Sequence, residues 1–207
     1  MKEIVDPQTT TRAAAFSLWM SSPMPMVTLT KTLNVTHLVR LARRNRLSFN
    51  MLLCHAIGKA ASTIPEFYTL PENGSLYRYD SLAVNVIVPN KEGGINSCDI
   101  PFVEDVRTFA EQYRQLTRKA SESATSTFLP ESMIIGTSAL IATEIDTIVN
   151  QYTDKFVNPM VMWARYRRKG FRRYLPVSFQ FHHVQMDGMQ GAHFLDKLQK
   201  QISSYEI

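Results

Sequence analysis

The stretch RYLPVSFQFHHVQMDG, from Arg173 to Gly188, decides how this chain folds. Its first part is rich in aromatic and apolar residues with polar ones between them, which predicts a strand. Asp187 follows as the predicted N-cap of a closing helix, because apolar side chains recur at helical spacing over residues 188–198. The end of the strand carries His182 and His183, two of only five histidines in the chain.

The residues alone leave three interpretations of this histidine pair open. Metal binding is disfavoured, because neighbouring side chains of a strand point to opposite faces and the other three histidines show no matching ligand spacing. Proton transfer fits an imidazole with a pKa near neutrality. A purely structural strand that leads into a capped helix is the third interpretation, and it competes evenly with proton transfer.

Outward from this stretch, strands and helices alternate along the chain. Periodicity and turn signals predict strands over residues 26–35, 82–88, 132–143, 158–168 and 173–185, and a hairpin at Asn73-Gly74. They predict helices over residues 36–45, 48–64, 104–123 and 187–198, the second of them an apolar core helix capped by Ser48.

This order of elements predicts an α/β two-layer sandwich, with a mixed, largely antiparallel sheet covered by helices. Neither GxGxxG nor GxxxxGK[ST] occurs in the sequence, so no nucleotide-binding loop is predicted. At 207 residues and 44% hydrophobic content, we expect one domain, residues 1–207, with one buried core.

Composition narrows the class of protein further. No apolar run reaches the roughly 20 residues of a membrane span and the N-terminus lacks a signal-peptide pattern, so we expect a soluble cytoplasmic protein. Cys54 and Cys98 share no CxxC spacing, so we expect two buried thiols. The net charge of +5 suits an anionic ligand but falls short of a dedicated nucleic-acid binder.

The strongest charge cluster is RYRRKGFRR, from Arg165 to Arg173, with six basic side chains in nine residues. A solvated hairpin tip and a site for an anionic cofactor are equally good interpretations of this run.

Several motifs together resemble the chloramphenicol acetyltransferase family. HHVQMDG, residues 182–188, is similar to the HHxxxDG signature of CoA-dependent acyltransferases. NPMVMWARY resembles the strand before it, GTSAL the family's serine-bearing strand, and RAAAFSLW its Arg-x-x-x-Phe opening. These ordered matches span nearly the whole chain.

The resemblance implies roles for particular residues. His183 corresponds to the general base and Ser138 to the hydroxyl that stabilises the transition state, although a strand serine bonded to backbone would be the interpretation without it. Asp187 and Arg12 correspond to a supporting ion pair. The remaining matches are Arg165 and Tyr166 near the cofactor channel, and Trp19 and Met162 in the acceptor pocket.

Two of these positions depart from the family. Met162 stands where the family has a threonine that helps to organise the transition state, and Trp19 stands where the family usually has Tyr or Phe. These changes predict a pocket reshaped for another acceptor.

The resemblance implies acetyl transfer from acetyl-CoA to chloramphenicol without an acyl-enzyme or a metal, in a homotrimer with its sites between subunits. From the moderate charge and the lack of a membrane-length apolar run, we expect no nucleic-acid or membrane partner. Acetyl transfer to a different small hydroxylated acceptor, and a trimeric scaffold that binds acyl-CoA without turnover, are the alternatives. The acyltransferase cores of 2-oxo-acid dehydrogenase complexes share a related motif, but we expect their lipoyl and linker segments to be absent.

Overall fold

A computed structural model describes residues 1–123 and 125–207 of the chain. Its strands are β1 (Lys2–Val5), β2 (Met26–Asn34), β3 (Thr69–Glu72), β4 (Ser75–Tyr79), β5 (Leu82–Pro89), β6 (Ile95–Pro101), β7 (Met133–Leu140), β8 (Met160–Ala164), β9 (Arg167–Lys169) and β10 (Arg172–His182). Its α-helices are α1 (Ala13–Trp19), α2 (Thr36–Asn45), α3 (Phe49–Ala61), α4 (Val106–Glu122) and α5 (Gly188–Ser203), and short 3-10 turns cover Pro7–Thr9 and Pro65–Tyr68.

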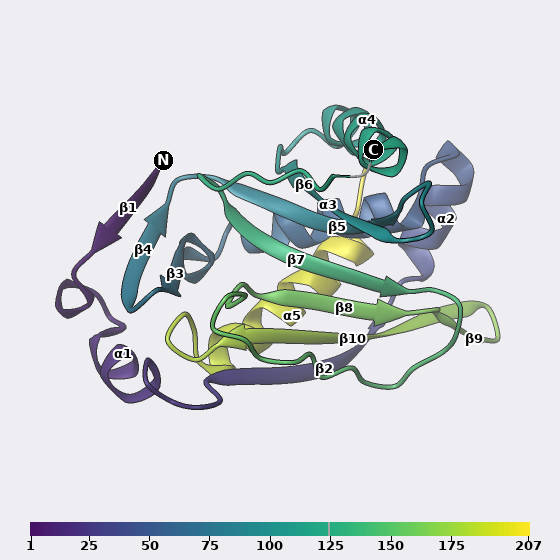
Figure 1. Ribbon diagram of the computed structural model, residues 1–207. Helices are drawn as coiled ribbons and strands as arrows, with labels where there is room; N and C mark the ends of the chain where they lie inside the picture. The colour runs from purple at the N-terminus through teal and green to yellow at the C-terminus, as the bar shows by residue number, and fades with distance from the viewer. Residues whose placement is uncertain (124) are drawn as a thin grey trace.

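The main sheet has the strand order β2-β10-β8-β7-β5-β6, with β9 paired to β10 (Figure 1). β7 runs parallel to both β5 and β8, and the other pairs are antiparallel. A smaller antiparallel sheet, β1-β4-β3, lies beside it. The predicted mixed, largely antiparallel α/β sandwich is therefore confirmed.

The two faces of the main sheet differ in chemistry, and β10 shows why. Val177, Phe179 and Phe181 belong to the hydrophobic core, with Phe179 at 4.6 Å between ring centroids from Phe194 of α5. The alternate residues Ser178, Gln180 and His182 are also buried but lie outside that core, because successive strand residues face opposite ways.

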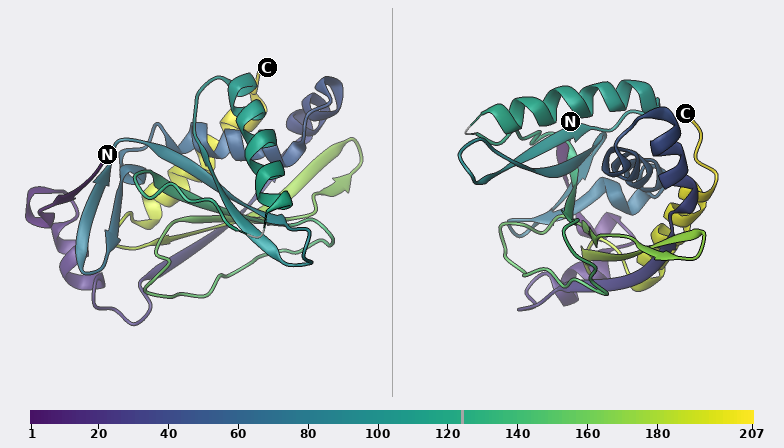
Figure 2. Two further views of the ribbon diagram at one scale, coloured as in Figure 1. Left: turned by 45° about the horizontal axis from the view of Figure 1, so that its top comes forward. Right: turned by 90° about the vertical axis from the view of Figure 1, so that its right-hand side faces the viewer.

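Helices and a long loop cover these two faces. α3 and α5 pack together on the apolar face (Figure 2). The segment of residues 141–159 connects β7 to β8 and crosses the polar face of the sheet on the way (Figure 1). It is held there by hydrogen bonds from the Ile148 N–H to Ser178 and from the Gln180 amide to the Asn150 carbonyl.

Most predicted elements are present with shifted ends. The 158–168 strand is divided into β8 and β9, and the last strand stops at His182, because residues 183–185 turn towards α5. The predicted hairpin joins β3 and β4, with positive φ at Asn73 and Gly74. Three elements were not predicted: β1, α1 and β6, whose residues lack a regular apolar period.

Candidate functional site

The histidine pair lies where β10 ends and the chain turns into α5. His182 is the last strand residue, paired with Met26 of β2. The His183 N–H donates to the Pro25 carbonyl at 2.8 Å, so β2 also fixes the start of the turn. A side chain carried on such a short, doubly tethered turn is held in a defined position, as a catalytic group requires.

Arg12 fastens this turn from the other end of the chain. Its guanidinium donates two hydrogen bonds to Asp187, at 2.8 and 2.9 Å, and further ones to the backbone carbonyls of His183 and Val184 at 2.6 and 2.8 Å. Arg12 is itself buried. A buried bidentate ion pair of this kind is strong and geometrically specific, and it joins the two residues, Arg12 and Asp187, that the family resemblance paired.

Asp187 therefore has a structural role in holding the turn and the start of α5. The hydrogen bonds from Arg12 lower the pKa of its carboxyl below the ordinary value. Asp187 also occupies the N-cap position of α5, and its backbone N–H donates to the side chain of Gln190. A carboxylate so strongly held as an anion is unsuited to taking a proton from His183.

His183 lies between Asp187 and Trp19. Its Nδ1 is 3.2 Å from a carboxylate oxygen of Asp187, although without the alignment of a hydrogen bond. The anion favours a proton on Nδ1, and a neutral imidazole then has its free lone pair on Nε2. The indole of Trp19 stacks on the ring, with centroids 4.7 Å apart and planes 6° from parallel. His183 keeps part of its side-chain surface exposed.

His182 has the opposite protonation chemistry. Its Nδ1 accepts a hydrogen bond from the Val184 N–H at 3.0 Å, so in the neutral ring the proton must sit on Nε2. Burial, with a smaller contribution from His183, lowers the pKa of His182 to about 4. A neutral imidazole with its Nε2 protonated can donate a hydrogen bond but cannot act there as a base, so His182 is the weaker candidate of the two.

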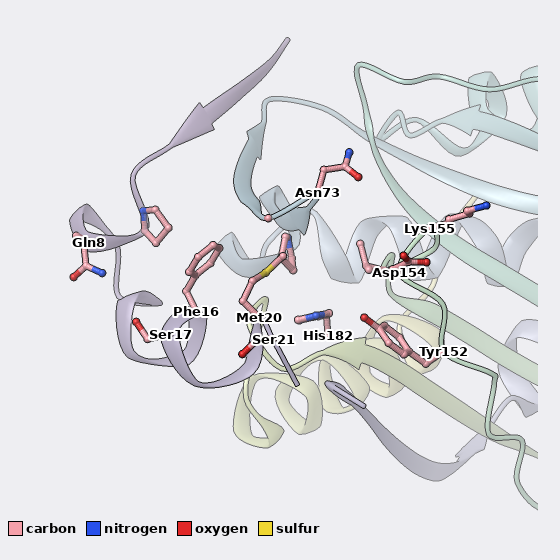
Figure 3. A pocket seen from close by; sticks show the side chains of 14 residues that line it. Gln8, Phe16, Ser17, Met20, Ser21, Asn73, Tyr152, Asp154, Lys155 and His182 are labelled. Atoms are coloured by element: carbon pink, nitrogen blue, oxygen red, sulfur yellow. The ribbon is translucent and has the colours of Figure 1, made fainter. Parts of the chain in front are cut away.

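A cavity of about 840 Å³ borders His182. Figure 3 shows the imidazole between Met20, which follows α1, and Tyr152 of the loop that crosses the polar face. Lys155 and Asp154 lie on the loop side, and Asn73 of the β3–β4 turn closes the top.

Ser138 is not brought to His183 within one chain. Ser138 pairs with Met162, and Met162 pairs with Ser178, which is five residues before His183. At about 4.8 Å per strand and 3.3 Å per residue, the Cα atoms of Ser138 and His183 are roughly 20 Å apart. Ser138 is partly exposed, whereas Met162, the residue between them, is buried.

Two hollows lie on either side of Ser138 along β7 and β8. A cavity of about 320 Å³ includes Gly136 and Met160, each two residues before the Ser138–Met162 pair. A second cavity of about 260 Å³, beyond the pair, includes Arg165 and Tyr166. Ser138 itself lines neither of the two cavities.

The predicted cofactor-binding residues thus share one cavity. Tyr166 contacts Phe49 edge to face at 5.5 Å between centroids, and the Arg165 N–H donates to the Thr143 carbonyl. In the basic run, Arg167 pairs with Asp146 and Glu144. Within the part of the chain that the structure describes, the other five basic side chains of the run form no ion pair, and Arg165 is the one that lines the cavity.

Neither predicted acceptor residue lines the 320 Å³ cavity: Trp19 stacks on His183, and Met162 is two residues along β8 from Met160. The sequence reasoning missed the residues that do, including Asn85 and Gln180. A signal for them exists, because Asn85 is the one polar residue in LAVNVIV, and Gln180 lies between two phenylalanines in VSFQFH.

Three further findings bear on the site. Both cysteines are buried free thiols, as predicted, and burial raises the pKa of Cys54 to about 12. Among residues 1–123 and 125–207, three or more His, Cys, Asp or Glu side chains nowhere gather closely enough to hold a metal ion. In the same part of the chain, the helices are too short or too polar to cross a bilayer.

Known proteins resemble this chain along nearly its whole length. Chloramphenicol acetyltransferase 2 of Escherichia coli is 26% identical over 94% of both chains, and the enzyme of that name from Haemophilus influenzae is 24% identical over the same shares. A solved chloramphenicol acetyltransferase superposes with a TM-score of 0.82 at 19% identity, covering 97% of this chain and 99% of its own.

A more distant fold neighbour is the truncated catalytic core of the 2-oxoacid dehydrogenase multienzyme complex from Thermoplasma acidophilum, at a TM-score of 0.71 and 16% identity over 99% of this chain and 100% of its own. Residues 2–199 match the family described as chloramphenicol acetyltransferase. The chain belongs to the chloramphenicol acetyltransferase family and thereby to the acetyl-CoA-dependent O-acetyltransferases.

Proposed function

We propose that this protein transfers the acetyl group of acetyl-CoA to a hydroxyl of chloramphenicol, with His183 as general base. The observation that supports this most is that the two histidines have different partners at Nδ1. Nδ1 of His182 accepts from a backbone N–H, whereas Nδ1 of His183 faces the carboxylate of Asp187, which leaves the lone pair of His183 on Nε2. Membership of the family supports the choice of donor and acceptor.

In the proposed reaction, Nε2 of His183 removes the proton from the acceptor hydroxyl as its oxygen attacks the thioester carbonyl. Asp187 stabilises the imidazolium that forms, at a separation of 3.2 Å. The C–S bond then breaks, His183 returns the proton to the CoA thiolate, and an acetyl ester and free CoA are the products. No covalent enzyme intermediate is required, because both substrates are held in one place.

Negative charge develops on the thioester oxygen during the attack, and Ser138 is the proposed donor to it. One hydrogen bond aimed at such an oxyanion contributes on the order of a hundredfold or more in rate. The smaller cavity with Arg165 and Tyr166 is the proposed site for acetyl-CoA, since a guanidinium suits its phosphates. The 320 Å³ cavity on the other side of Ser138 is the proposed acceptor site.

The distance of roughly 20 Å between His183 and Ser138 requires a second copy of the chain. We propose that His183 of one subunit faces Ser138 and both hollows of its neighbour, in a homotrimer. Exposed apolar side chains at the rim of the 320 Å³ cavity, Phe128 at 64% and Phe156 at 75%, are consistent with a surface that another subunit covers.

Release of CoA thiol from acetyl-CoA, with and without chloramphenicol, tests the reaction. Release that depends on chloramphenicol and is lost in His183→Ala is the expected result. Acetyl-CoA binding without thiol release, on chloramphenicol and on a panel of other hydroxylated acceptors, would leave the non-catalytic scaffold as the better account. Release on another acceptor but not on chloramphenicol would support the same chemistry with a different substrate.

A further inference from the structure

One residue that lines the 320 Å³ cavity lies across a glycine. Met160 of β8 pairs with Gly136 of β7, and both residues line the cavity. A Cβ added to Gly136 would overlap Sδ of Met160 and would lie 3.4 Å from its Cγ and Cε. The thioether of Met160 therefore occupies the recess over Gly136, the space that any other residue at position 136 would fill with its own Cβ.

This recess accounts for a glycine inside a strand. Gly136 has no positive φ, so its backbone conformation is open to other residues. Glycine in the interior of a strand weakens the strand and often marks a close approach by another group. The group that approaches here is the side chain of Met160. Gly136 and Met160 are thus a matched pair, in which one residue leaves the space that the other uses.

Met160 has only two directions open to it, the recess and the cavity. On its other side β10 presents Gln180, which pairs with Met160 and is 1% exposed. The amide of Gln180 is held in place, because it donates to Thr28 at 3.1 Å and to the Asn150 carbonyl at 3.0 Å. Along β8, the next residue on the same face is Met162, which is buried. Filling the recess would therefore move the thioether of Met160 into the cavity.

We infer that Met160 is a specificity-determining residue of the acceptor site, and that its thioether in the recess of Gly136 is the surface on which an aromatic ring of the acceptor rests. This inference deepens the proposed function and rests on it for the use of the cavity as the acceptor site. A thioether is polarisable and makes favourable contacts with aromatic rings. Phe128 and Phe156 continue the apolar surface at the rim. Chloramphenicol carries a phenyl ring, so the inference agrees with the proposed acceptor.

Gly136→Ala fills the recess. The group that the new Cβ displaces is a flexible side chain, so we expect the variant to fold with nearly unchanged thermal stability. The displaced thioether would take up room in the cavity, and the Kd of chloramphenicol, measured by titration calorimetry, should rise roughly tenfold or more. Gly94→Ala in the β5–β6 turn is the matched control, because a Cβ there comes no closer than 3.5 Å to other atoms, and both values should stay as in the wild type.

Met160→Ala removes the side chain that Gly136 accommodates. Alone, it should raise the Kd of chloramphenicol about threefold, the loss of one sulfur–aromatic contact. Combined with Gly136→Ala, it should return the Kd to about that same threefold value, because no thioether is left to be displaced. The Kd of acetyl-CoA should be unchanged in all three variants, since its proposed cavity shares no lining residue with this one.

The methyl resonance of Met160 gives an independent measure of the ring contact. In protein with carbon-13 in its methionine methyl groups, Met160→Ala identifies this resonance by its disappearance. Saturating chloramphenicol should shift the resonance, because an aromatic ring that lies against a methyl group changes the local magnetic field. The measurement requires no acetyl donor and no turnover. A resonance that stays in place while chloramphenicol binds would overturn the inference.

The outcomes separate the inference from the proposed function. An unchanged Kd in Gly136→Ala, or a double variant that binds no better than Gly136→Ala, would overturn the inference. If Gly136→Ala does not fold, an unchanged Kd in Met160→Ala would overturn it, and so would a wild-type protein that does not bind chloramphenicol. The expected order of Kd values without thiol release from acetyl-CoA would instead contradict the proposed function and leave the inference standing.

Discussion

At the scale of single residues, one hydrogen bond distinguishes two adjacent histidines. Nδ1 of His182 accepts from a backbone N–H, whereas Nδ1 of His183 faces a carboxylate. The first contact places the proton on Nε2, and the second leaves Nε2 free. Strand alternation in the sequence predicts that the two rings face opposite ways, but it cannot say which nitrogen meets which partner, because those partners come from the turn and from α5.

Substitution of His183 tests the assignment of the base. His183→Ala should lower kcat for thiol release by 10² to 10⁴, the range for loss of a general base, and should leave acetyl-CoA binding unchanged. His182→Asn, whose oxygen can accept from the Val184 N–H in place of Nδ1, should retain most of the activity. Steady-state kinetics give kcat for both variants. A larger loss of kcat in His182→Asn than in His183→Ala would assign the general base to His182.

His182 also makes stability depend on pH. Its pKa is depressed to about 4 in the folded protein, so as the pH falls below about 6.5 the unfolded chain takes up a proton that the native chain does not. Stability is thus present above the unfolded pKa and is lost as the pH falls towards the folded one. Between about pH 7.5 and pH 5, His182 should cost roughly 2 kcal/mol of unfolding free energy.

Urea denaturation at the two pH values measures this dependence. His182→Asn does not titrate and should lose correspondingly less stability than the wild type over the same range. His55, whose pKa is also lowered by burial, is present in both proteins and therefore cancels in the comparison. Equal losses in the two proteins would show that His182 is ordinarily solvated.

At the scale of elements, the closing strand and helix hold the site, and their contact is tight at one glycine. Gly191 of α5 lies so close to β10 that an added Cβ would be 2.6 Å from the Phe181 ring. The sequence predicts the helix and its N-cap from local pattern. It does not predict that closeness, because the approach of a helix to a sheet depends on side chains far apart in the chain, including Leu29 of β2.

Gly191→Ala should therefore destabilise the fold. Overpacking of a well-packed contact costs about 1 to 3 kcal/mol, which outweighs the gain in helix propensity of about 1 kcal/mol. Gly188→Ala is the matched control, because a Cβ at that position meets nothing within 4 Å. Chemical denaturation compares the two variants, and equal stability would mean that α5 lies farther from the sheet.

At the scale of the whole molecule, the order of strands explains why one chain cannot contain the whole of the proposed site. GTSAL and HHVQMDG are both recognisable in the sequence, and the strand pairing separates them by roughly 20 Å. The sequence identifies the individual residues through a resemblance, whereas their separation follows only from the register of β7, β8 and β10. The polar cavity likewise forms from strands that are distant in sequence.

The shared site predicts that the protein is a homotrimer in solution. Sedimentation equilibrium should give three times the mass of one chain, 23.6 kDa. Ser138→Ala should reduce kcat/KM about a hundredfold, the cost of one donor to an oxyanion, without changing that mass. A monomeric wild-type protein that is fully active would contradict the shared site.

Complementation between two impaired variants tests the central claim most directly. Ser138→Ala and His183→Ala chains are co-expressed in equal amounts, and thiol release is measured on the purified mixture with the acceptor that the wild type uses. If each site takes His183 from one subunit and Ser138 from the next, about a quarter of the sites in random trimers are intact, and activity should approach a quarter of the wild-type value. If each site lies within one chain, every site carries one defect, and activity no higher than the mean of the two variants would contradict the account.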